Sequence, residues 1–95
     1  MSGTCPDVRQ FTLSDHAQEQ MQRRGIPETV VARVLRAPEQ RAQVRPGRCV
    51  YQMCLALGTY AGDRLVRVFV DIDRVPVEVV TVYVTSKIDK YRRAP

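Results

Sequence analysis

Residues 65–85, LVRVFVDIDRVPVEVVTVYVT, decide the fold of this chain. Branched and aromatic side chains fill two runs, Leu65–Ile72 and Val77–Thr85, and such residues favour β-strands. The turn sequence Asp73–Pro76 separates them, so the stretch predicts an antiparallel hairpin. Strict alternation puts Arg67 on the face of the first strand opposite its valines. It also predicts one face of the second strand that holds Val77, Val79, Thr81, Tyr83 and Thr85.

The preceding sequence repeats this pattern of strands and turns. Three turn sequences follow one another at similar intervals along the chain: Pro46-Gly47, Gly58–Asp63 and Asp73–Pro76. This regular spacing predicts an antiparallel meander over residues 41–85. Residues 41–45 form either a first strand of this meander or a segment too short to count as one. A short run at 11–13 begins a further strand, so we expect three to five strands.

Two amphipathic helices are expected before the meander. Ser14 is a good N-cap, and Gly25 supplies the stop of a first helix that ends at about residue 24. Pro27 opens a second helix and Pro38 ends it, because the residue before a proline is driven out of helical conformation. Both helices carry narrow apolar stripes that must be buried against a sheet.

These elements predict an α+β fold with two N-terminal helices packed on one face of the antiparallel sheet. The other face then stays partly open and bears arginines. With 95 residues the chain is expected to be one domain, made of an N-terminal arm (1–10), a helical part (11–38), the meander (41–85) and a basic tail (86–95).

The composition favours a soluble cytoplasmic protein. No apolar run reaches the roughly 18 residues of a membrane span, so no membrane partner is expected, and the N-terminus lacks the basic and apolar parts of a signal peptide. Cys5, Cys49 and Cys54 are odd in number and contain no CxxC pair, so we expect them to be small buried hydrophobic residues. One histidine and scattered cysteines give no convincing zinc site, and we expect no metal and no cofactor.

The net charge of +5 is concentrated in two segments. Residues 33–48 carry +4 and residues 87–93 carry +3, whereas the rest of the chain carries −2. Thirteen of the fifteen cations are arginine, whose planar guanidinium suits two-pronged contact with phosphate. The pattern is typical of a small nucleic-acid-binding surface, although a basic, solvated face has the same composition.

The residues available for chemistry fit one reaction well, the transesterification of RNA. The sequence has no phosphate-binding glycine loop and no local hydrolase motif, which leaves His, Arg, Lys and Tyr. The ribose 2′-hydroxyl is itself a nucleophile, so a protein needs only a proton acceptor, a proton donor and cations around the phosphate. We assign catalytic roles to His16, Arg67 and Tyr83. We assign RNA binding to Arg23, Arg45, Arg48, Thr81, Lys87 and Tyr91. Each of these residues also has an ordinary structural interpretation. Tyr51 is another aromatic residue on a predicted strand, and aromatic residues on strands more often belong to the core.

The chain resembles an uncharacterised bacterial domain family. The resemblance rests on a Ser-x-His-Ala element, an Arg-Gly-Ile element and a Thr-x-Tyr strand before a basic tail that contains tyrosine. Here these elements are Leu13-Ser14-Asp15-His16-Ala17, Met21, Arg23-Arg24-Gly25-Ile26, Val34-Leu35, Pro38, Val80-Thr81-Val82-Tyr83 and Lys90-Tyr91-Arg92. The layout is similar to that of RelE/ParE-type toxins within the barnase/colicin/RelE-like ribonuclease group.

The resemblance implies a toxin-like domain that cleaves RNA or blocks translation, with RNA, on or off the ribosome, and an antitoxin protein as partners. On the family pattern, the positions that carry over are His16, Arg23, Thr81 and Tyr83. The sequence thus predicts a metal-independent endoribonuclease, or alternatively a non-catalytic module that binds RNA or protein. The oligomeric state is left open.

Overall fold

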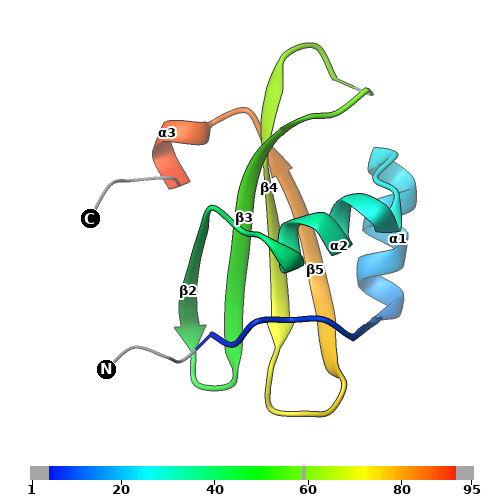
Figure 1. The fold of residues 1–95 in the computed structure, drawn as a ribbon. Helices are drawn as coiled ribbons and strands as arrows, with labels where there is room; N and C mark the ends of the chain where they lie inside the picture. The colour runs from blue at the N-terminus through cyan, green and yellow to red at the C-terminus, as the bar shows by residue number, and fades with distance from the viewer. Residues whose placement is uncertain (1–4, 59, 92–95) are drawn as a thin grey trace.

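The computed structural model describes residues 5–58 and 60–91 as a single five-stranded sheet with helices around it (Figure 1). The strands follow the order β1-β5-β4-β3-β2, in which only β1 and β5 are parallel. The elements in chain order are β1 (Phe11–Leu13), α1 (Asp15–Arg24), α2 (Glu28–Arg36), β2 (Gln40–Arg45), β3 (Arg48–Ala56), β4 (Asp63–Asp71), β5 (Val77–Thr85) and α3 (Ile88–Tyr91).

The predicted α+β fold with two N-terminal helices on an antiparallel meander is confirmed. Residues 40–45 do form a strand, and the basic tail contains one helical turn, α3. The sheet is not wholly antiparallel, because β1 runs beside β5 in the same direction. Residues 1–4 of the predicted arm and residues 92–95 of the predicted tail lie outside the described residues, as does Thr59 in the second turn.

The ends of α1 lie where the capping residues predict them. The Ser14 hydroxyl accepts a hydrogen bond from the Ala17 amide at 3.1 Å and caps α1. Gly25 ends α1 in the left-handed conformation (φ 65°), which glycine adopts without steric cost. Pro27 is the N-cap of α2, one position earlier than the first-turn position expected from the sequence.

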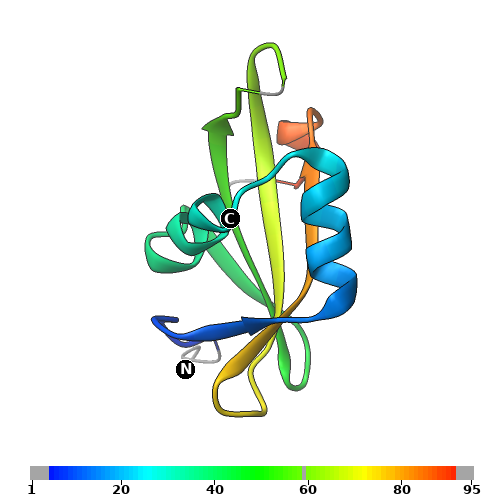
Figure 2. The ribbon, with the colours of Figure 1, turned by 90° about the vertical axis from the view of Figure 1, so that its right-hand side faces the viewer.

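The two helices occupy different places on the sheet. In Figure 2, α2 lies on one side of the sheet and α1 lies along β5. The start of α1 is tied to β5 because the Ser14 amide donates to the Val79 carbonyl at 2.9 Å. Valines of β4 and β5 form the core beneath the helices, together with Ala17, Met21, Val31, Val34 and Leu35.

One prediction about β5 is wrong, because the strand does not alternate strictly. Val70 pairs with Val79, but the neighbouring Phe69 pairs with Thr81, so Val80 is an extra residue in the β5 register. The shift places both Val79 and Val82 in the core. Thr81 then lies on the opposite face of the sheet, which we call the open face because α1 and α2 do not cover it.

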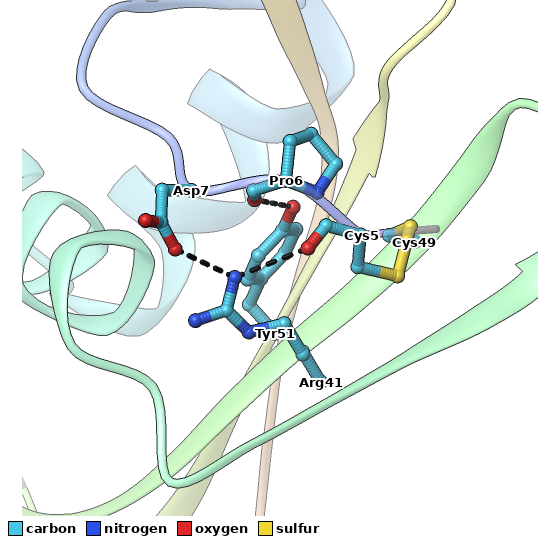
Figure 3. The surroundings of a disulfide bond; sticks show 6 residues. All are labelled: Cys5, Pro6, Asp7, Arg41, Cys49 and Tyr51. Carbon is cyan, nitrogen blue, oxygen red and sulfur yellow. Dashed lines mark hydrogen bonds and ion pairs between the residues drawn. A yellow bond between two sulfur atoms is a disulfide. The ribbon is translucent and has the colours of Figure 1, made fainter. Parts of the chain in front are cut away.

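The N-terminal strap (residues 5–10) is fastened to the sheet by a disulfide bond and by polar contacts (Figure 3). Cys5 is bonded to Cys49 in β3. The buried Tyr51 hydroxyl donates a hydrogen bond to the Pro6 carbonyl. Arg41 donates to the Cys5 carbonyl at 3.1 Å and to the Asp7 carboxylate at 2.8 Å.

The disulfide corrects the interpretation of the cysteines. Cys49 is fully buried as expected, but it is covalently paired with Cys5, and only Cys54 is free. An odd cysteine count is compatible with one disulfide and one thiol, and a sequence separation of 44 residues gives no local indication of the pairing.

The interpretation of Tyr51 as a core residue is confirmed, because its side chain is fully buried in the hydrophobic core.

Candidate functional site on the open face

The open face brings Arg67, Tyr83 and Thr81 together, as three of the predicted site residues. Across β3, β4 and β5 the pairing register gives a row of Gln52, Arg67 and Tyr83. The next row contains Val50, Phe69 and Thr81. Residues in one row have neighbouring side chains on the same face of a sheet.

Arg67 is the cation at the centre of this face. Its Nε donates to Gln52 Oε1 at 2.9 Å, and its guanidinium carbon lies 4.3 Å from the Tyr91 ring centroid and 5.3 Å from that of Phe69. Within residues 5–58 and 60–91, no carboxylate forms an ion pair with Arg67. Burial lowers the pKa of the Arg67 guanidinium, while the nearby Tyr91 and Tyr83 raise it in part. The site therefore holds a partly desolvated positive charge that favours an incoming anion.

Gln52 fixes the orientation of Arg67. The Gln52 side chain is buried, and its Nε2 donates to Gln40 Oε1 at 2.8 Å and to the Tyr91 carbonyl at 3.0 Å. With both amide hydrogens directed to these acceptors, Oε1 faces the Arg67 Nε and accepts from it. Gln52 and Gln40 were not predicted as site residues from the sequence. The signal that could have identified Gln52 is a polar glutamine within the otherwise apolar run of β3.

Tyr91 closes the site from α3. Its ring lies edge-on to the Tyr83 ring, with 6.1 Å between the centroids. A hydrogen bond with Tyr83 is the main cause of a lowered Tyr91 pKa, and the positive charges of Lys90 and Arg67 act in the same direction. The lowered pKa makes Tyr91 a more acidic phenol than a free tyrosine, beside the Arg67 charge.

The side of α1 next to β5 borders the site. Gln20 Oε1 accepts from the Val82 amide at 2.9 Å, and the Arg24 guanidinium carbon lies 5.8 Å from the Tyr83 ring centroid. His16 is spaced four residues from Gln20 and eight from Arg24, which puts all three on one side of α1. At 1.5 Å per residue, His16 lies about 12 Å from Arg24 along the helix axis. His16 is exposed and lies farther along the β5 edge than the cluster around Arg67.

A pocket of about 410 Å³ opens between β2, β3 and α3. It is lined by Gln40, Arg41, Ala42, Val50, Gln52, Arg67 and Tyr91. Its walls thus combine the aliphatic side chains of Ala42 and Val50, the amides of the half-buried Gln40 and the buried Gln52, an aromatic ring and the Arg67 charge. Such a mixture of apolar surface and a few polar groups is common in ligand sites.

The other predicted RNA-binding residues are dispersed. Arg48 is engaged by Asp71, since its Nε and Nη2 lie 2.6 and 3.2 Å from the two carboxylate oxygens. Arg23 forms an exposed ion pair with Glu19 at 3.2 Å. Arg45 and Lys87 are exposed, at the end of β2 and just before α3.

Two arginines of the basic segment 33–48 are thus neutralised by carboxylates of the same chain. The Asp71 carboxylate accepts from Arg48, and this hydrogen bond is the main cause of the lowered Asp71 pKa. Arg41 is paired with Asp7 in the N-terminal strap.

In the described part of the chain, no group of three His, Cys, Asp or Glu residues could hold a metal ion. None of the helices described there has the length and apolar character that a membrane span requires.

Comparison with protein-family models gives a match that covers most of the chain. No curated protein and no solved structure matches significantly. A family model described as a domain of unknown function, DUF4258, matches residues 13–84. The match spans β1 to β5 and includes Gln52, Arg67 and Tyr83, whereas Cys5 and Tyr91 lie outside it. The chain belongs to the DUF4258 family.

Proposed function

We propose that this protein binds RNA on its open face and cleaves it by 2′-hydroxyl transesterification without a metal. The observation that carries the proposal is Arg67, a partly desolvated cation with no ion-pair partner among the described residues. A phosphodiester supplies the missing negative charge, and the free edge of the guanidinium can donate two hydrogen bonds to it.

In this mechanism Arg67 holds the phosphate and stabilises the charge that develops on its oxygens. A base accepts the proton of the 2′-hydroxyl as its oxygen attacks phosphorus. An acid then protonates the departing 5′-oxygen, and a 2′,3′-cyclic phosphate remains. Tyr91 is the proposed proton-transfer group beside Arg67, because its pKa is lowered, and Tyr83 is its hydrogen-bond partner. His16 is a second candidate proton-transfer group, on α1 beside β5, and it would act only on a ligand that extends along β5 from Arg67. Thr81 offers a hydroxyl in the open-face row next to that of Arg67 and Tyr83.

The biological role that fits this activity is that of a toxin-like ribonuclease. Two helices on an antiparallel sheet, with a basic tail, are similar to the layout of RelE/ParE-type toxins. We therefore propose an antitoxin protein as partner, cellular or ribosome-associated RNA as substrate, and the cytoplasm as the location. Performing the assay in EDTA tests whether cleavage needs a divalent metal ion.

The test is cleavage of a labelled single-stranded RNA in EDTA, with analysis of product ends. Arg67→Gln is expected to lower the cleavage rate about 100-fold or more, and Tyr91→Phe or His16→Ala about 100-fold if that residue transfers a proton. Arg33→Gln is the matched control, because it removes one exposed arginine on α2, on the other side of the sheet.

Salt-dependent RNA binding without cleavage, lost in Arg67→Gln, would support the alternative of a non-catalytic RNA-binding module. Unchanged binding and cleavage in Arg67→Gln would contradict the open-face site altogether.

A further inference from the structure

We infer that the open-face pocket holds a single nucleotide with its base turned out of the stack, so the substrate is single-stranded RNA. The inference rests on the proposed function for the phosphate at Arg67, and it adds a binding site for the base. Its basis is the shape and lining of the pocket of about 410 Å³ between β2, β3 and α3.

The size of the pocket sets the size of the ligand. A volume of about 410 Å³ lies at the small end of the range for small-molecule sites, roughly 300–1,000 Å³. A pocket of this size accepts one planar base and its sugar, but not a stacked pair of nucleotides. A continuous basic groove would accommodate a backbone without enclosing any base, and this pocket is a local hollow bounded by α3.

The lining sets the chemistry of the ligand. Ala42 and Val50 provide an aliphatic floor, Tyr91 provides an aromatic wall, and the positive charge of Arg67 lies at the wall. The ligand must therefore join a flat apolar body to an anion. A nucleotide meets both needs, since bases stack on aromatic rings and on guanidinium planes while the phosphate pairs with the cation.

The position of Tyr91 shows how the base and the phosphate are separated. The Tyr91 carbonyl is held by Gln52 at 3.0 Å, and its ring lies over the Arg67 guanidinium. One face of that guanidinium is thus covered by Tyr91, and the Nε edge is occupied by Gln52. Arg67 lines the pocket, so a phosphate bound at the remaining edge of its guanidinium would leave the base of the same nucleotide next to the pocket.

A base can enter this pocket only after it leaves its helical stack. In double-stranded RNA the base faces are covered by neighbouring pairs, whereas unpaired bases can be turned outwards and stacked on protein side chains. We therefore expect a single-stranded oligonucleotide to bind at least 10-fold more tightly than a duplex of the same length and sequence.

The experiment compares three probes on the full chain by calorimetry: a nucleoside monophosphate, ribose 5-phosphate and inorganic phosphate. The nucleotide is expected to bind at least 10-fold more tightly than ribose 5-phosphate. Ala42→Leu, which fills the pocket from an exposed position of β2, is expected to abolish this difference and leave phosphate binding unchanged. Gln43→Leu, the exposed neighbour on β2, is the control and should preserve the difference.

The outcomes separate this inference from the proposed function. Equal affinity for the nucleotide and ribose 5-phosphate, or for single-stranded and duplex RNA, overturns the base pocket even if RNA is cleaved. A base preference that Ala42→Leu abolishes supports the pocket even if no cleavage occurs. Absence of binding by all three probes overturns both the pocket and the phosphate site at Arg67.

Discussion

The open-face site depends on a small number of residues whose side chains constrain one another. Gln52 directs the Arg67 guanidinium and also holds the α3 backbone through the Tyr91 carbonyl. A buried amide that makes three hydrogen bonds specifies one arrangement, because any rotation would leave a buried donor or acceptor unpaired. Arg67 supplies the charge that a ligand meets, and Gln52 fixes the position of that charge.

Gln52→Glu should convert the anion site into an internal ion pair. A carboxylate would replace the amide oxygen that lies 2.9 Å from Arg67 Nε and would neutralise the cation. We expect RNA affinity to fall about 10-fold or more and the slope of log K against log salt to fall by about one in magnitude. Titration by ultraviolet absorbance should also show the Tyr91 pKa moving upwards, since Arg67 would no longer favour the phenolate.

Gln43→Glu introduces the same charge at an exposed position of β2 and serves as the control. Equal losses of affinity in the two variants would indicate a general electrostatic effect and contradict the positioning role of Gln52.

Asp71 should make the stability of the protein depend on acidic pH. Its pKa is lowered chiefly by the hydrogen bond from Arg48, so its contribution is fully present above the unfolded value of about 3.9 and is lost as pH falls through the lower folded value. Asp71→Asn should lower the free energy of unfolding by about 2 kcal/mol at pH 7. In urea unfolding the difference from wild type should shrink below pH 4. Asp63→Asn, an exposed carboxylate at the other end of β4, should have little effect at either pH.

Among the elements, β5 determines which residues reach the open face. The sequence was sufficient to predict the β4–β5 hairpin, both helices and the caps of α1, because alternation, turns and capping are local properties. It was not sufficient to predict the extra residue Val80, since a run of valines fits either face. Nor could it pair β1 with β5, because that contact joins residues 66 positions apart.

The candidate site was predictable only in part for the same reason. Arg67, Tyr83 and Thr81 lie on one hairpin, and the hairpin register brings them together. Tyr91 in α3 was also a predicted site residue, but nothing in its local sequence places it beside Arg67, and Gln52 in β3 was not predicted.

The edge of β5 should depend on α1 through Gln20. Its Oε1 accepts the Val82 amide at 2.9 Å, where β5 extends beyond its pairing with β1. Gln20→Ala should lower the free energy of unfolding by about 1 kcal/mol and speed hydrogen exchange of the Val82 amide. Gln22→Ala changes an exposed residue of α1 and should leave that exchange rate unaltered.

At the scale of the whole molecule, the disulfide ties the N-terminal strap to β3, the strand next to the β2 edge of the sheet. Together with the contacts of Tyr51 and Arg41, it holds Val8 in the core. Disulfides persist mainly in oxidising surroundings. If the protein is cytoplasmic, as proposed, Cys5 and Cys49 are therefore expected to be reduced to free thiols for at least part of the time. Alkylation of the protein in intact cells, followed by mass analysis, counts three free thiols in the reduced form and one in the oxidised form.

Cys5→Ser should lower the free energy of unfolding by about 2–4 kcal/mol under oxidising conditions, because the unfolded chain would no longer be closed into a ring. Thermal unfolding with and without dithiothreitol measures the same effect in the wild type. Cys54→Ser leaves the ring intact and should unfold at the wild-type temperature. A wild-type melting temperature that is insensitive to dithiothreitol would show that the strap needs no covalent tie.

The position of the β4–β5 hairpin in the sheet has a consequence for how the protein could be divided. The hairpin lies between β3 and β1, and β1 belongs to the segment closed by the Cys5–Cys49 bond. A chain cut between β3 and β4 would give an N-terminal piece that already carries both flanking strands, tethered to each other, and a C-terminal piece that supplies the two missing ones. The β4–β5 hairpin is therefore inserted between two strands of the N-terminal piece, and split halves should reassemble through the β3–β4 and β1–β5 pairs.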